Sequence, residues 1–237
     1  MTTAAIIQAR IGSNRLPGKV ALELYDSKSM LWWVIQRVKK VRLLDMVILA
    51  TPDTAKDNIL KGICADTGIY LYQGSENDVL DRYAKAALRF NVDVIVRVTA
   101  DCPFIDPDVI TKSIRFFNDN TFEYVSTVGS YPDGLDTEIF SITTLYSAWK
   151  GAKSNYHREH VTPYIRESGL YTIGLVPSDI DFRFKNYHWS IDTIEDFNMA
   201  VKMYERLKYD FRLADIVKLV DGGIKPRYLE DKNKTNE

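Results

Sequence analysis

Short apolar runs alternate with helical patterns along the first half of the chain, and this alternation limits the fold more than any other feature. Apolar runs at residues 4–7, 46–50, 69–72 and 92–98 are typical of strands that are buried on both faces of a sheet. Between these runs, apolar residues recur at helical spacing. The series predicts an α/β fold with a parallel sheet and right-handed crossovers.

Capping residues indicate where the helices begin and end. We expect one helix to start at Thr51-Pro52, with Thr51 as its N-cap, and to stop near Gly68. Others should run from Val79 to Leu88 and from Asp106-Pro107 onward, where Asp106 is most simply a helix cap. The segments that follow the strands then lie at the carboxyl ends of the strands, which is the edge where parallel sheets bind ligands.

The second half of the chain is less regular. Further strands are expected at 123–127, 136–140, 170–176 and 187–191. A helix interrupted by Pro163 is expected at 158–167, and an amphipathic helix at 193–207 carries Ile194, Phe197, Val201 and Tyr204 on one face. We therefore expect one domain over residues 1–222, with an inserted region at about 131–166. Residues 223–237 form a polar tail that should fray from Lys225 onward.

Composition excludes several classes of protein. The 237 residues are 46% hydrophobic with a net charge of −1, which suits neither a disordered chain nor an obligate nucleic-acid or membrane-surface binder. No apolar run reaches about 18 residues, so no membrane span is expected, and the N-terminus does not resemble a signal peptide. Cys64 and Cys102 are too few for a disulfide framework, and we expect both to fill the core of a cytoplasmic protein.

The most informative stretch is the loop at residues 8–19, which follows the first strand directly. It carries Gly12, Ser13 and three cations, Arg10, Arg15 and Lys19. Backbone N–H groups of a glycine loop can approach an anion that Arg and Lys neutralise, and three cations suit a polyphosphate. The loop matches neither the Walker A box nor the dinucleotide fingerprint. The alternative is a solvated basic turn.

Two aspartates lie just past predicted strands. Asp101 is placed to hold Mg²⁺ against phosphates, although a turn or cap would also explain it. Asp192 lies where a strand passes into a helix, and Glu195 three residues later would complete a capping box, which is a sufficient structural explanation. The two carboxylates could also clamp one cation.

A third group of polar residues lies in the irregular region. Asp136 and Glu138 follow a turn at residues 131–134 and should share one face of a strand. Downstream, His157, Arg158 and Glu159 could bind a carboxylated or hydroxylated ligand. A zinc site at His157 and His160 is disfavoured, because no further ligand motif accompanies the pair.

Six segments in this order resemble the cytidylyltransferase family of CMP-Kdo and CMP-acylneuraminate synthetases, and most closely the branch of the spore-coat polysaccharide biosynthesis protein F. They are residues 8–19, 74–82, 99–103, 131–136, 158–164 and 192–196. The resemblance covers roughly residues 4–206. It implies a three-layer, Rossmann-like nucleotidyltransferase fold with a mainly parallel central sheet and a projecting dimerisation element.

The resemblance also implies an activity and its residues. CMP would pass from CTP to the anomeric hydroxyl of an acidic sugar of nonulosonic or 3-deoxy-octulosonic type, with release of pyrophosphate and use of Mg²⁺. Asp101 and Asp192 match the metal ligands, and with Arg10, Arg15 and Lys19 they form the expected catalytic set. Nucleotide binding is expected at Ala9, Arg10, Gly12, Ser13, Arg15, Lys19, Thr51, Asp53, Ser75, Asn77, Asp78, Thr99, Ala100 and Asp101. Acceptor binding is expected at Tyr131, Asp133, Asp136, Glu138, His157, Arg158, His160 and Trp189.

Several points stay open at this stage. Ala100 stands where this branch often has Gly, and its methyl group could crowd the nucleotide. A glycosyltransferase, cytidylyl transfer to a non-sugar acceptor and a non-catalytic nucleotide sensor or scaffold are alternatives on the same fold. A homodimer is expected, with Tyr131, Tyr146, Trp149 and Tyr164 as anchors in the region at 131–166.

Overall fold

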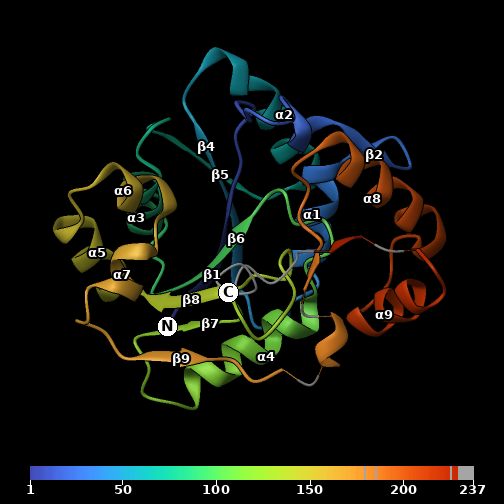
Figure 1. The fold of residues 1–237 in the computed structure, drawn as a ribbon. Helices are drawn as coiled ribbons and strands as arrows, with labels where there is room; N and C mark the ends of the chain where they lie inside the picture. The colour runs from blue at the N-terminus through green and yellow to red at the C-terminus, as the bar shows by residue number, and fades with distance from the viewer. Residues whose placement is uncertain (179, 185, 225, 229–237) are drawn as a thin grey trace, which may run out of the picture.

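A seven-stranded sheet forms the centre of the molecule (Figure 1). The computed structural model describes residues 1–178, 180–184, 186–224 and 226–228. The strand order is β5-β4-β1-β6-β8-β7-β9, and β8 is the strand that runs against its neighbours. The bounds are β1 Thr3–Gln8, β4 Met46–Pro52, β5 Tyr70–Gly74, β6 Val94–Thr99, β7 Tyr124–Ser126, β8 Glu138–Ser141 and β9 Ile173–Leu175.

Helices cover both faces of this sheet. One layer contains α1 Met30–Val38, α2 Asn58–Thr67, α4 Pro107–Asn118, α8 Ile194–Leu207 and α9 Leu213–Asp221. The other contains α3 Val79–Arg89, α5 Ile142–Gly151, α6 Asn155–His160 and α7 Pro163–Glu167. Successive residues of β1 feed the two cores, because side chains alternate along a strand: Ile7 packs in the first and Ile6 in the second. The expected α/β fold with a mainly parallel sheet is confirmed.

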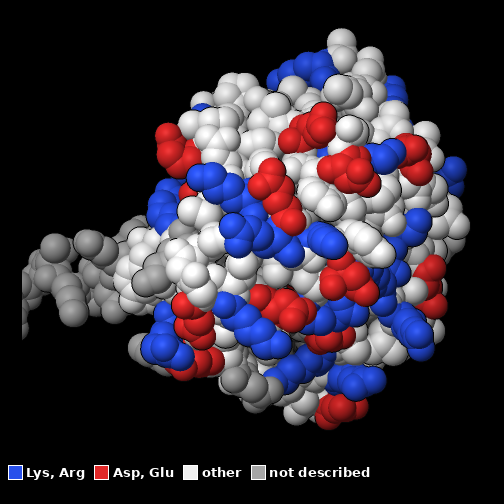
Figure 2. Space-filling view, turned by 90° about the vertical axis from the view of Figure 1, so that its right-hand side faces the viewer, with Lys and Arg blue, Asp and Glu red and all other residues white. Residues whose placement is uncertain are grey.

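Smaller elements complete the fold. A hairpin joins β2 Glu23–Tyr25 to β3 Lys28–Ser29, and β10 Tyr187–His188 pairs antiparallel with β11 Arg227–Tyr228. Three 3₁₀ turns lie at Lys19–Ala21, Ala55–Asp57 and Phe182–Phe184. On the face that carries α1, α8 and α9, basic and acidic side chains are interspersed (Figure 2), in keeping with the net charge of −1.

Most predicted elements are present, and the differences have local causes. Thr51 and Pro52 do not start a helix: they extend β4, where they pair with Gln73 and Gly74 of β5, and α2 begins only at Asn58. The helix does end at Gly68, in the left-handed conformation. Asp106 caps α4 as expected, accepting hydrogen bonds from the backbone N–H groups of Asp108 and Val109.

Three further expectations change near the C-terminus. The helix expected at 158–167 is two helices, α6 and α7, separated at Val161, whose φ is 73°. Ile194 does not share the buried face of α8: its side chain is 47% exposed, whereas Phe197 and Tyr204 are buried. Arg227 and Tyr228, expected to fray, form β11, while Lys225 and residues 229–237 of that tail lie outside the described residues.

Both cysteines fill the core as predicted. Cys64 and Cys102 are buried and unpaired, and burial raises the pKa of the Cys64 thiol to about 11. Within the described part of the chain, no helix combines the length and the apolar composition that crossing a membrane requires.

Candidate active site

A cavity of about 340 Å³ opens at the carboxyl ends of β1 and β6. Its walls come from the loop after β1, from the turn after β6, from the first turns of α3 and the end of α6, and from Asp192 before α8. Eleven of the expected site residues line it: Ala9, Arg10, Ser13, Arg15, Lys19, Thr99, Ala100, Asp101, Glu159, His160 and Asp192. The volume is in the range of small-molecule sites.

The loop after β1 is held in shape from behind. The buried carboxylate of Asp57 accepts hydrogen bonds from the Ile11 backbone N–H, at 2.8 Å, and from the Thr54 hydroxyl. At the far end of the loop, Gly18 adopts a φ of 73° and donates its N–H to the Ile11 carbonyl. These contacts fix the backbone and leave the side chains of Arg10, Ser13 and Arg15 on the cavity wall.

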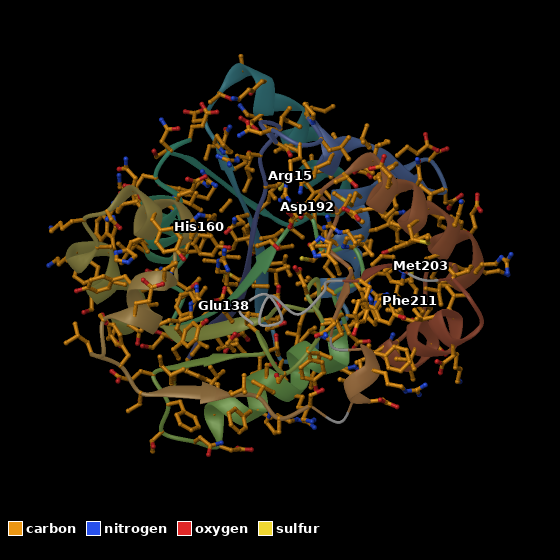
Figure 3. All side chains as sticks on the ribbon, in the orientation of Figure 1. Arg15, Glu138, His160, Asp192, Met203 and Phe211 are labelled. Atoms are coloured by element: carbon orange, nitrogen blue, oxygen red, sulfur yellow. The ribbon has the colours of Figure 1, made fainter. Side chains whose placement is uncertain are left out.

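Lys19 joins the two predicted carboxylates. Its Nζ lies 2.8 Å from Asp101 Oδ2 and 3.3 Å from Asp192 Oδ1, and it also donates to the Ile191 carbonyl. Arg15 Nη2 lies 2.6 Å from Asp192 Oδ1, and the two labelled side chains meet in Figure 3. The two carboxylates therefore converge on the Lys19 ammonium, and their predicted role as a metal clamp stays a prediction.

Asp192 is not the cap of α8. The N-cap is Thr193, whose hydroxyl accepts from the Asp196 N–H while the Asp196 carboxylate accepts from the Thr193 N–H. The capping box thus lies one residue later than the sequence indicated, and Glu195 takes no part in it. The Asp192 carboxylate instead contacts Arg15 and Lys19. Helix capping therefore no longer explains why an aspartate stands at this position.

His188, which sequence reasoning missed, supports Asp192 from behind. The buried imidazole lies between two carboxylates, with Nδ1 2.8 Å from Asp133 Oδ2 and Nε2 3.2 Å from Asp192 Oδ2. Burial by itself would lower the pKa of His188, but its contacts with Asp133 and Asp192 raise that pKa to about 9. In turn, hydrogen bonding with His188 keeps the pKa of Asp192 well below its ordinary value, against the effect of burial and with help from Lys19 and Arg15.

The opposite wall carries a second set of ion pairs. Arg10 Nη2 lies 3.3 Å from Glu159 Oε1 of α6. Asp78 caps α3 and accepts hydrogen bonds from the Arg158 guanidinium, which also donates to the Trp149 carbonyl. Asp78 and Arg158 thus hold α3 and α6 together behind the cavity wall.

A family model described as cytidylyltransferase matches residues 4–233. The chain belongs to the cytidylyltransferase family. This cytidylyltransferase is therefore a CTP-binding nucleotidyltransferase, as the sequence indicated. The match favours that reaction class over the alternatives of a glycosyltransferase and a non-catalytic protein.

Two of the similar proteins span most of the chain, and a third spans about half of it. The spore coat polysaccharide biosynthesis protein SpsF of Bacillus subtilis is 32% identical over 224 residues, which are 91% of this chain and 92% of that protein. A 3-deoxy-manno-octulosonate cytidylyltransferase of Pelobacter propionicus is 34% identical over 131 residues, 55% of this chain and 50% of that one. The structure of a cytidylyltransferase from Leptospira borgpetersenii matches with a TM-score of 0.90 at 29% identity, covering 97% and 99% of the two chains.

The remaining expected nucleotide residues of this cytidylyltransferase lie outside the cavity lining. They are Gly12, Thr51, Asp53, Ser75, Asn77 and Asp78. Thr51 is buried, and Ser75 accepts a hydrogen bond from the Asp78 N–H. Asp53 donates its backbone N–H to Gly74, so it fastens β4 to β5.

The expected acceptor residues are placed mostly behind the cavity. Glu138 is buried, because β8 pairs with β6 and sets it opposite Arg97; it forms an ion pair with Arg97 and accepts from Tyr124 and Thr162. Tyr131 and Trp189 are buried in the core. Burial and the charges of Asp133 and Glu138 raise the pKa of Asp136 to about 7. The others outside the lining are Asp133, Asp136, His157 and Arg158.

Five lining residues were not named as expected site residues: Gln8, Asn14, Val20, Val79 and Arg82. Gln8 and Asn14 lie in the loop at residues 8–19, and Val79 and Arg82 lie in the segment at residues 74–82 that carries the resemblance. Arg82 was not singled out within that segment, because an arginine in a helix is ordinarily a surface residue.

Proposed function

We propose that this cytidylyltransferase transfers CMP from CTP to the hydroxyl of an acidic sugar and releases pyrophosphate, for the synthesis of a surface polysaccharide or glycan. The observation that carries the proposal is the convergence of Arg15, Lys19, Asp101 and Asp192 at one end of a cavity that extends to α3 and α6. The names of two relatives support the substrate class, since one acts in polysaccharide biosynthesis and one on 3-deoxy-manno-octulosonate.

The chain's own residues suit this chemistry. Nucleotidyl transfer requires alignment of a hydroxyl with the α-phosphate and stabilisation of the charge on the leaving pyrophosphate. The loop after β1 supplies Arg10, Arg15 and Lys19 for the phosphates, and the acceptor hydroxyl would have to reach the end of the cavity where Asp101 and Asp192 converge. Substitution of Lys19 or Arg15 by Ala should remove about 2.7–4 kcal/mol of transition-state stabilisation, as for other oxyanion donors.

We propose Mg²⁺ as the metal. The donor set fits: two carboxylates, Asp101 and Asp192, converge with the Ile191 carbonyl on one cation, and hard oxygen ligands of this kind suit Mg²⁺. When bound, Mg²⁺ would neutralise phosphate charge and lower the pKa of a bound hydroxyl. In this structure Lys19 and Arg15 neutralise the negative charge of the two carboxylates. A bound metal would neutralise that charge in their place and leave both side chains available to the phosphates.

Two further proposals concern the assembly of the protein and its place in the cell. A homodimer is supported by exposed aromatic residues in the region at 131–166, where Tyr146 is 38% and Tyr156 52% exposed. The buried Tyr131 belongs to the subunit's own core and drops out as an anchor. Work in the cytoplasm is supported by the two unpaired cysteines.

A screen of acceptors tests the proposal. Purified enzyme, CTP and Mg²⁺ are combined with 2-keto sugar acids and with neutral sugars, and pyrophosphate release is measured. Acidic sugars should give release that is absent with the neutral ones, and Asp192→Asn should abolish it. Release with the neutral sugars alone would refute the acidic-sugar proposal while leaving cytidylyl transfer in place.

A further inference from the structure

We propose that His188 is a positioning residue that fixes the orientation of the Asp192 carboxylate, and that Asp133 in turn fixes His188. The inference rests on the proposed role of Asp192 in holding Mg²⁺ and names the groups that prepare Asp192 for that role. Asp192 lines the cavity, whereas His188 and Asp133 do not. The two residues would therefore act through Asp192 and not by contact with a substrate.

The two oxygens of the Asp192 carboxylate face different groups. Oδ1 lies 2.6 Å from Arg15 Nη2 and 3.3 Å from Lys19 Nζ, on the side of the cavity. Oδ2 lies 3.2 Å from His188 Nε2, and Arg227 Nη2 is farther from it, at 3.7 Å. A carboxylate that is held at one oxygen cannot turn freely about its last side-chain bond. The contact at Oδ2 therefore sets the direction in which Oδ1 points.

His188 is itself held in place. The side chain is buried, its Nδ1 lies 2.8 Å from Asp133 Oδ2, and its Nε2 lies 3.0 Å from Ser190 Oγ. The imidazole thus stands between two carboxylates. A rotation of the ring that broke the contact with Asp192 would also break the contact with Asp133, so the three side chains form one fixed row.

A close approach of two backbone segments brings Asp133 to His188. The Trp189 N–H donates to the Asp133 carbonyl at 2.8 Å. Gly134 has a φ of 95° and packs so tightly against this segment that a Cβ would lie 2.5 Å from the Ser190 backbone nitrogen. Glycine is the residue that tolerates both conditions. The turn that the sequence predicted therefore contributes to the site by placing Asp133 behind His188.

A contact of this kind acts on a metal site from outside. Carboxylates that ligate a metal are commonly hydrogen-bonded by a second group, and loss of that group typically costs about 10- to 100-fold in metal affinity or activity. His188 is placed to be such a group, because it contacts the Asp192 oxygen that does not face Arg15 and Lys19. A histidine with a structural role only would affect stability and leave the metal's contribution to CTP binding unchanged.

Two substitutions of His188 separate its two contacts. The amide nitrogen of glutamine extends about as far from the backbone as Nε2, so His188→Gln can still donate to Asp192. The amide nitrogen of asparagine extends only as far as Nδ1, so His188→Asn keeps a donor near Asp133 and loses the one near Asp192. Both variants remove the charge of the imidazole, and a difference between them therefore reports the position of the donor.

The measurement is the affinity for CTP, determined by calorimetry without acceptor, once in Mg²⁺ and once in EDTA. The ratio of the two affinities isolates the contribution of the metal. We expect His188→Asn to lower this ratio about tenfold and His188→Gln to lower it by less than about threefold. The affinity in EDTA should stay close to that of the wild type in both variants, because the cations of the loop after β1 are unchanged.

Arg37→Lys is the matched control. Arg37 on α1 is buried and donates to the carbonyls of Ile105 and Phe211, so its substitution should lower stability without changing the ratio. Circular dichroism checks the folding of each variant. If His188→Asn does not fold, Asp133→Ala takes its place, because it removes the contact that holds His188 from the other side, and it should lower the ratio in the same direction.

Four results would overturn the inference. An equal loss in both His188 variants would assign the effect to charge, and an unchanged ratio in both would leave His188 with a structural role only. A matching loss of affinity in EDTA would indicate damage to the nucleotide site itself. If Mg²⁺ does not change the affinity of the wild type for CTP, the proposed metal falls together with the inference. The acidic-sugar proposal is tested separately, because no acceptor takes part in this experiment.

Discussion

At the scale of single residues, Asp192 carries the sharpest prediction. Because Thr193 and Asp196 cap α8, Asp192→Asn should leave the helix in place and remove a charge that faces Lys19 and Arg15. We expect kcat/KM to fall at least about 100-fold, the size of effect seen when one transition-state contact is lost. Steady-state kinetics measure the fall in kcat/KM, and far-ultraviolet circular dichroism shows whether the helix content is kept. Near-wild-type rates at saturating Mg²⁺ would exclude Asp192 from the site.

His188 gives a prediction about pH. Its pKa is raised from 6.5 to about 9 in the folded protein, so the charged imidazole stabilises the fold fully below pH 6.5. That contribution is lost as the pH rises through about 9. The melting temperature of the wild type should therefore fall between pH 7 and 9.5, and His188→Gln should flatten this fall. The pKa of Asp136 is lower, at about 7, so titration of this carboxyl group does not account for a fall in melting temperature up to pH 9.5. Parallel slopes for the two proteins would contradict the assignment.

At the scale of elements, the loop after β1 depends on the left-handed conformation of Gly18. Gly18 has a φ of 73° with open space where a Cβ would point, so Gly18→Ala meets backbone strain and no clash. We expect a loss of about 1–2 kcal/mol in the free energy of unfolding and weaker CTP binding, because the loop carries Arg15 and Lys19. Urea denaturation and calorimetry with CTP provide the measurements.

Gly62 is the matched control for that change. It also has open space around a Cβ, but it lies inside α2 without a positive φ. Gly62→Ala should therefore stabilise the protein by about 0.5–1 kcal/mol and leave CTP binding unchanged. If both substitutions acted alike, conformation at Gly18 would not control the loop.

At the scale of the whole molecule, the prediction concerns assembly. Tyr146 is exposed, packs against Trp149 with the two rings tilted to one another and lies under the Lys150 ammonium, so it presents an aromatic surface on α5. We expect a homodimer in sedimentation experiments at micromolar concentration and a monomer for Tyr146→Glu. Tyr209→Glu changes an exposed tyrosine outside the region at 131–166 and should leave the dimer intact. A monomeric wild type would refute the proposal.

The sequence by itself determined the parts of this protein that depend on local pattern. The strands β1, β4, β5 and β6 and the helices between them follow from periodicity, because burial on both faces of a sheet demands apolar runs. The cations of the loop after β1 and the two aspartates follow from their places after strands. The resemblance in six segments added the family, which the matching family model confirms.

Only the tertiary structure decided which of these groups meet. Lys19 contacts Asp192 across 173 positions, and no local pattern encodes that distance. Glu138 forms a buried ion pair because β8 lies antiparallel beside β6. The cap of α8 is Thr193, one residue beyond the predicted position. Arg82 and His188 gained their surroundings in the same way, because burial and charge partners arise from packing between elements and not from the order of residues along the chain.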